Sequence, residues 1–179
     1  MISGVNFGLF RRTREPNRPV IRPEMTPVDW LLEAIALVGL GVLLGYVAYY
    51  YPQLPASIPT HFNAAGVADE YGTRTSILFL PVIALFIYVM MTLINLVPHT
   101  FNYPGKITPA NAPRQYTLAT RLVRYLKTLL VLLFFYISYS TTQVVINEAS
   151  GLGRWFLPLF LSFLFIPIIV YMVMALSKK

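Results

Sequence analysis

Four long apolar runs dominate this sequence and limit what the chain can fold into. They cover about residues 28–50, 75–98, 113–147 and 155–176. A helix needs roughly 20 apolar residues to cross a hydrocarbon core about 30 Å thick, and each run is long enough. Charged residues make up only 12% of the chain, against about a quarter in soluble domains. The sequence therefore predicts an all-α membrane protein, folded as an antiparallel bundle of four transmembrane helices.

The basic residues predict how this bundle is oriented. Twelve of the fourteen Lys and Arg residues precede the first run, lie between the second and third runs or early in the third, or end the chain. Cytoplasmic segments of membrane proteins carry the excess of Lys and Arg. Both termini are therefore predicted to be cytoplasmic, and the loop at 52–74 to be exoplasmic.

Residues 1–26 read as a basic arm that precedes a transmembrane domain at 27–179. The arm is rich in Arg and Pro, and no apolar stretch of a secretory signal peptide precedes the first run. Polybasic segments attract anionic lipid headgroups by about 1 kcal/mol per charge. The acidic face of another membrane subunit is the alternative partner, whereas the topology explains the basic charge without nucleic acid. The predicted interface residues are Arg11, Arg12 and Arg14 of the arm, with Arg121 and Arg124 of the third run.

The loop at 52–74 is predicted to be an ordered cap rather than a flexible connection. Its first part holds Pro52, Pro55 and Pro59, which favour an extended, polyproline-like path. Gly66 and Gly72 then permit turns with positive φ. A loop this long without a helical period is usually functional or disordered, and its rigid punctuation favours order.

The same loop carries the pattern L-P-x-x-I-P-x-H-F-N-x-x-G-x-x-D-x-Y-G, from Leu54 to Gly72. With its flanking helices, about residues 30–100, it resembles a bacterial membrane-domain family of unknown function. That family also forms the N-terminal part of SdpI-type immunity and signalling proteins, which protect cells from a secreted toxic peptide. The resemblance implies a bacterial inner-membrane protein with no established catalytic chemistry. The candidate cap residues are His61, Phe62, Asn63, Gly66, Asp69 and Tyr71.

Two interpretations of the polar cap residues remain open. His61 and Asp69, with Asn63 and Glu70 nearby, are a candidate metal or proton-transfer site, because imidazole and carboxylate groups suit both. A zinc site needs three or four placed ligands, however, and the loop offers one nitrogen ligand. The alternative is structural, with these side chains bonding the loop backbone. We expect the structural role, with no metal and no cofactor.

The first helix carries two local signals. Thr26, Pro27 and Asp29 predict its start, with Thr26 as N-cap and Asp29 completing a capping box. Gly41 and Gly45 form a G-x-x-x-G motif, which predicts a close helix contact within the chain or with a partner.

Ionisable residues inside the apolar runs are the remaining candidates for chemistry. Glu33 lies one turn inside the first helix, where a charge is costly unless paired. An ion pair with the arm or with Arg121, Arg124 or Lys127 is the expected role, and a proton relay is the alternative. No acid or histidine lies deeper in any run to continue such a relay.

The third run also carries a polar stripe, made of Ser138, Ser140, Thr141, Thr142 and Gln143. Such hydroxyl and amide groups bond neighbouring helices or line a pocket beneath the cap. Ser138 lacks the sequence context of a hydrolase nucleophile, and the absence of cysteine excludes disulfides and thiol chemistry.

Three functions fit the sequence. The first is a small non-enzymatic, SdpI-like membrane protein whose cap senses or neutralises an extracellular ligand. The second is an accessory subunit of a larger membrane complex, and the third is a metal-dependent membrane enzyme using His61 and Asp69.

Overall fold

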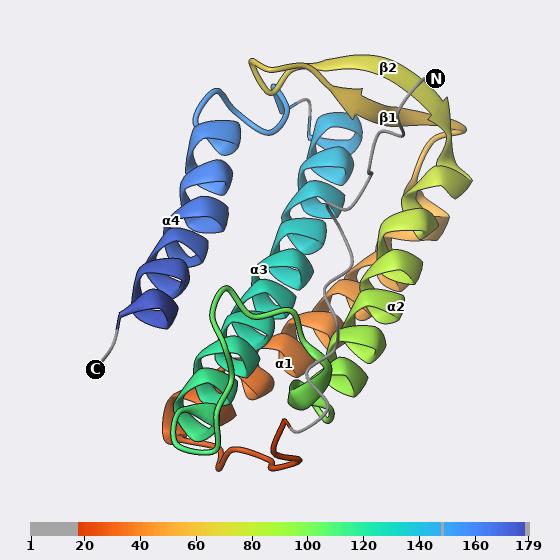
Figure 1. Cartoon of the computed structure of the whole chain (residues 1–179). Helices are drawn as coiled ribbons and strands as arrows, with labels where there is room; N and C mark the ends of the chain where they lie inside the picture. Colours follow the sequence, from red (N-terminus) through yellow and green to blue (C-terminus); the bar gives the residue numbers. More distant parts are fainter. Residues whose placement is uncertain (1–17, 148, 178–179) are drawn as a thin grey trace, which may run out of the picture.

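The computed structural model describes residues 18–147 and 149–177, so Arg11, Arg12 and Arg14 lie outside the described part of the chain. Four helices form the bundle: α1 (Pro27–Tyr50), α2 (Phe79–Ile94), α3 (Ala112–Ile146) and α4 (Phe156–Leu176) (Figure 1). All four are long and apolar enough to cross a membrane, α2 together with the 3-10 turn that precedes it. The predicted fold class is confirmed, and the chain is a multi-pass membrane protein.

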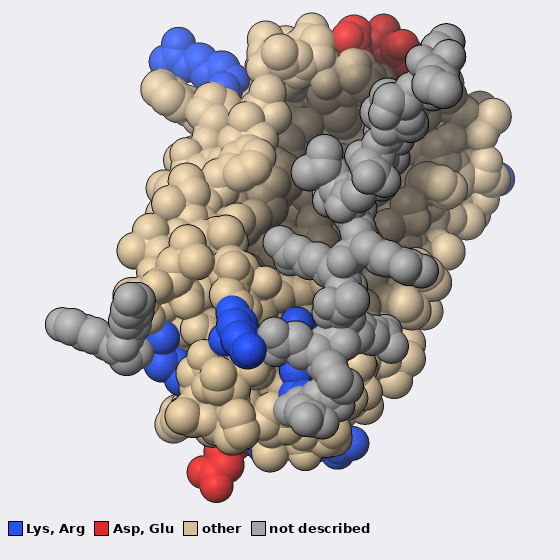
Figure 2. Space-filling view, viewed as in Figure 1, with Lys and Arg blue, Asp and Glu red and all other residues tan. Residues whose placement is uncertain are grey.

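The surface agrees with this assignment. On the face shown in Figure 2, most Lys and Arg side chains of the described residues gather at the end away from the hairpin, and the described residues of a broad middle band show no charged side chain. Such a band matches the hydrocarbon region of a bilayer, where charged side chains are costly.

The start of α1 follows its local sequence. The backbone N–H of Thr26 donates to Asp29 Oδ2 at 2.9 Å, and the Asp29 backbone N–H donates to Thr26 Oγ1 at 3.4 Å. This reciprocal pair is the predicted capping box, and it satisfies two N–H groups that a helix end leaves without partners.

The second helix is shorter than the sequence predicted. Residues Arg74–Leu78 form a 3-10 turn, so α2 begins at Phe79 rather than near residue 75. At its other end the helix stops at Ile94, and a further 3-10 turn covers Pro98–Thr100. A residue before proline is disfavoured in the helical region, so the chain leaves the helix before Pro98.

The central helix α3 packs against each of the other three. The main apolar core lies where α1, α2 and α3 meet the hairpin, and includes Leu43, Ile58, Ile77, Ala84 and Val131. The surface of α1 that contacts α3 includes Gly39, where an added Cβ would lie 3.2 Å from Val131 Cγ1.

The expected contact at Gly41 and Gly45 is therefore wrong within the described part of the chain. Both glycines are exposed, and an added Cβ at either would meet no described atom within 4 Å. The motif lies on the surface of α1 that turns away from α3, because Gly39 and Leu40 occupy the buried side. A contact with a partner remains a prediction.

The cap is a β-hairpin, formed by β1 (Ser57–Phe62) and antiparallel β2 (Ala68–Thr73). Pro59 fits because the register is irregular just after it, and proline is tolerated at such bulges. Gly66 has the predicted positive φ, +77°. The prediction for Gly72 is wrong: this glycine lies within β2, and it allows close approach of Thr60, whose methyl would lie 2.8 Å from an added Cβ.

The fourth helix is held to α3 through main-chain acceptors. Arg114 Nη2 donates to Met174 O at 2.7 Å, and Gln115 Nε2 donates to Ala175 O at 2.8 Å. Nearer the middle of α4, the Tyr125 hydroxyl donates to Phe163 O at 2.8 Å. These donors reach the terminal carbonyls that a helix leaves unpaired, and one carbonyl in the middle of α4.

Candidate functional site

A groove of about 770 Å³ lies beneath the hairpin and is the candidate site. Its walls come from β1, the 3-10 turn before α2, the first turns of α2, the outer part of α3 and the start of α4. Figure 1 shows α2 and α4 on opposite sides of α3, and α4 packs chiefly against α3. The groove is therefore bordered by two helices that share little contact.

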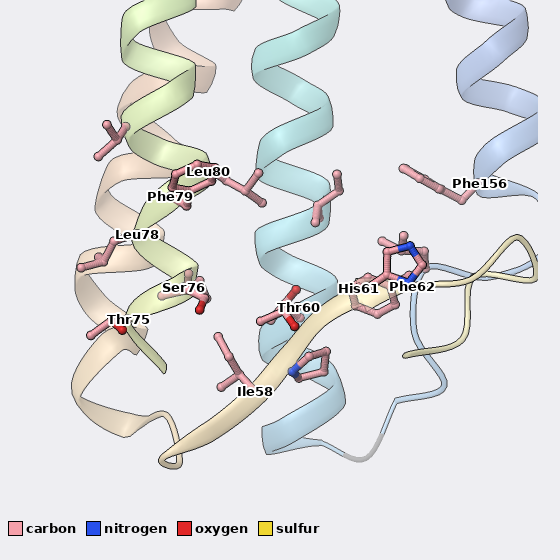
Figure 3. Close-up of a pocket in the computed structure, with 16 residues that line it drawn as sticks. Ile58, Thr60, His61, Phe62, Thr75, Ser76, Leu78, Phe79, Leu80 and Phe156 are labelled. Carbon is pink, nitrogen blue, oxygen red and sulfur yellow. The ribbon is translucent and has the colours of Figure 1, made fainter. Parts of the chain in front are cut away.

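Most of the groove surface is apolar. Phe156 projects from α4 toward α3, and Leu80 projects from α2 (Figure 3). Ile58 of β1 and Ile137 of α3 add to this lining. A concave apolar surface with a few placed polar groups is the usual form of a small-molecule site, and such sites measure roughly 300–1,000 Å³.

The polar groups of the groove are mostly hydroxyls. Thr60, Ser76 and Thr141 line it, and none of their hydroxyls has a hydrogen-bond partner among the described residues. Thr141 as a residue is only 5% exposed, so it is a largely buried side chain of the lining. The polar stripe of α3 was predicted either to bond neighbouring helices or to line a pocket beneath the cap. Of its residues, Thr141 lines the groove.

His61 is the titratable group of the lining. Its Nδ1 lies 2.6 Å from Asp69 Oδ1 across the hairpin, and the two side chains are 59% and 40% exposed. The hydrogen bond that His61 makes to the Asp69 carboxylate, together with the negative charge of Asp69, raises the pKa of His61 above the ordinary value of 6.5. With Nδ1 held by the carboxylate, the ring is oriented and Nε2 is left available.

The metal interpretation gains no third ligand. In the described ranges, 18–147 and 149–177, no group of three or more His, Asp or Glu side chains could hold an ion. His61 and Asp69 form a pair in which the Asp69 carboxylate orients the His61 ring.

The other predicted cap residues separate into two groups. Phe62 lines the groove beside His61. Asn63 and Gly66 build the hairpin turn, where Asn63 Oδ1 accepts from the backbone N–H groups of Ala65 and Val67. Tyr71 is exposed on β2 and does not line the groove.

The connection between α3 and α4 supplies residues that the sequence did not single out. Leu152 lines the groove, and its backbone N–H donates to Gly66 O at 2.8 Å. The Tyr136 hydroxyl donates to Leu152 O at 2.9 Å, which fixes the other side of the same residue. The glycines on either side of Leu152, both at positive φ, were the available signal.

A second polar cluster lies at the opposite end of the bundle. Glu33 Oε2 accepts from Lys127 Nζ at 2.6 Å, and Glu33 Oε1 lies 3.3 Å from Arg124 Nε as an ion pair without hydrogen-bond geometry. Asp29 pairs with Arg121 at 3.1 Å and with Arg124 at 3.5 Å. The predicted ion pair of Glu33 is confirmed, and the cluster joins α1 to α3.

Comparison with known proteins finds similarity over part of the chain. Residues 38–85, which hold part of α1, the hairpin and the start of α2, match a domain of unknown function (DUF1648). An uncharacterized protein of Archaeoglobus fulgidus is 33% identical over 89 residues, which cover 45% of this chain and 49% of that protein. The chain thus spans about half the length of the curated relative it matches. No solved structure matches the chain.

Proposed function

We propose that this is a small non-enzymatic, SdpI-like protein of the bacterial inner membrane, with a cap that senses or neutralises an extracellular ligand. The observation that carries the proposal is the groove beneath the hairpin. It combines apolar walls, the hydroxyl group of the largely buried Thr141 and an oriented imidazole at His61. The match at residues 38–85 includes the hairpin, so the matched segment provides the roof of the groove.

The orientation belongs to the same proposal. The hairpin end faces the outside, and both termini face the cytoplasm, because Lys and Arg concentrate in the segments at the other end. The chain has no cysteine, so a single introduced cysteine reports one position. Ala64→Cys and Ser150→Cys should react with an impermeant thiol reagent in intact cells, and Ala110→Cys should not. Reaction at 110 with protection at 64 would reverse the orientation and remove the proposal.

Ligand binding is tested by protection of the groove. Thr60→Cys places a thiol in the groove, whereas Ala64→Cys places a matched thiol in the exposed hairpin turn. Membranes carrying each variant are treated with fractions of spent growth medium and then with the thiol reagent. A fraction that protects position 60 and not position 64 contains the ligand, which mass spectrometry then identifies. Equal reaction at both positions in every fraction would refute the proposal.

The accessory-subunit function rests on a different observation. Ala175 is the one buried residue of α4, so nearly the whole helix faces outward in the described chain. Gly41 and Gly45 leave a second outward surface on α1. Native purification in mild detergent tests this function, which requires stable subunits at constant ratio and is excluded by a chain that purifies alone.

A further inference from the structure

The chemistry of the groove narrows the class of ligand it takes. Its lining contains apolar, hydroxyl and imidazole side chains, and no carboxylate. His61 is the group there that can carry charge, and that charge is positive. Asp69 Oδ1 lies 2.6 Å from Nδ1, so Nε2 is the ring nitrogen that remains for a ligand.

The position of these groups along the groove matters as much as their identity. Thr60 and His61 come from β1, which roofs the groove, whereas Phe79 and Leu80 lie on the first turn of α2 (Figure 3). The polar part therefore lies at one end and the apolar part extends along the helices. A ligand that fits has one polar end and one apolar chain.

The route into the groove also fits such a molecule. α4 packs chiefly on α3, so in the described chain α2 and α4 border the groove without closing on each other, and in the proposed orientation this border lies in the outer leaflet. A chain dissolved in the outer leaflet can enter sideways without crossing the hairpin. A single groove of about 770 Å³ lies within the range of sites for one small molecule.

We propose that the groove binds a single-chain anionic amphiphile, a free fatty acid, with its carboxylate at His61 Nε2 and its chain between α2 and α4. This inference rests on the proposed ligand-binding function and names its ligand. Protonated His61 donates from Nε2 to the carboxylate, and the hydroxyls of Thr60 and Thr141 are further donors. The raised pKa of His61 supports this role, since it extends the pH range in which the ring is charged.

The experiment compares ligands with the same chain and different ends. The purified full chain is placed in nanodiscs of zwitterionic lipid with a photoreactive palmitate analogue, and crosslinked residues are mapped by mass spectrometry. Unlabelled palmitate, hexadecanol and hexadecylamine then compete. Palmitate should compete about tenfold better than hexadecanol, because a hydrogen bond between charged groups is worth that much, and the amine should compete least.

Variants separate the charge from the groove. Asp69→Asn and His61→Leu should reduce the preference for palmitate over hexadecanol to about twofold or less while chain binding persists. Ile137→Trp should fill the groove and abolish all crosslinking there, whereas Leu159→Trp, exposed on α4, should not. Size-exclusion profiles of each variant show that the fold is retained.

The outcomes distinguish this inference from the function it rests on. Equal competition by the three ligands, with crosslinks still in the groove, would overturn the anionic class and leave ligand binding standing. Equal competition by phosphatidylglycerol would replace the free fatty acid by a two-chain lipid and overturn the single-chain proposal. Absence of groove crosslinks would overturn the fatty acid, while the thiol-protection test decides the broader function independently.

Discussion

Replacing each member of the Glu33–Lys127 pair by methionine should destabilise the bundle unequally. Lys127 is 0% exposed, and besides Glu33 it contacts only the Thr92 hydroxyl at 2.9 Å and the ring of Tyr88 at 4.5 Å among the interactions described. Glu33 is 22% exposed and has a second counter-ion in Arg124. Removing the carboxylate therefore strands an enclosed charge, whereas removing the ammonium does not.

The magnitudes follow from this asymmetry. Breaking a buried ion pair so that one charge is uncompensated costs about 3–5 kcal/mol, and Glu33→Met should fall in that range. Lys127→Met removes one charged hydrogen bond, worth about 2 kcal/mol, since Arg124 still neutralises Glu33. The double variant should cost less than the sum of the two by about 1 kcal/mol or more, because groups in contact couple.

The free energy of unfolding can be measured by SDS titration in mixed micelles, followed by circular dichroism. Leu159→Met on the exposed face of α4 is the matched control and should change it little. A loss for Lys127→Met equal to or greater than that for Glu33→Met would refute the reasoning. So would strict additivity in the double variant, since it would show that the two charges do not interact.

Three further predictions concern the glycines and the histidine. Gly39→Leu should lower the free energy of unfolding in detergent by about 1–3 kcal/mol, because α3 side chains lie against that position. Gly41→Leu should leave the free energy of unfolding of the monomer nearly unchanged. Equal decreases for the two variants would contradict the described faces of α1. Gly66→Ala should speed amide hydrogen exchange in the loop between α3 and α4, because the new Cβ would lie 2.6 Å from a loop carbonyl oxygen; unchanged protection would contradict that contact. The pKa of His61, measured by NMR, should lie above 6.5 and should fall in Asp69→Asn; a pKa at or below 6.5 would contradict the pairing. Because the folded-state pKa is raised, the pair stabilises the hairpin fully below the ordinary pKa of histidine. This stabilisation is lost as the pH rises through the raised pKa.

The parts of the fold that local sequence determines could be predicted. Apolar length is enough to place the four helices, and the Thr26–Asp29 capping box depends on neighbours within one turn. The ion pair of Glu33 could be predicted because a charge at that depth requires a partner, and α3 offered cations at the same depth.

The remaining features depend on where distant segments meet. The sequence predicts a proline-stiffened loop rather than a hairpin, because the two strands gain stability only from pairing across the turn and packing on the helix ends. The choice of Gly39 over Gly41 depends on which side of α1 meets α3. The groove needed the approach of Leu152 to Gly66, which no local pattern specifies.

The attachment of α4 has a consequence for how this protein can change through evolution. Arg114, Gln115 and Tyr125 all donate to peptide carbonyl groups, which every residue type carries. Recognition through these carbonyl groups therefore does not depend on the identity of the accepting α4 residues, whereas the bond from Arg114 Nη2 to the hydroxyl of Ser177, which follows α4, does. One apolar residue can replace another along the outward surface of α4 without loss of these hydrogen bonds, whereas substitution of any of the three donors on α3 would remove one. Homologous chains should accordingly differ most in α4 and least at these three positions, and a sequence alignment tests that expectation.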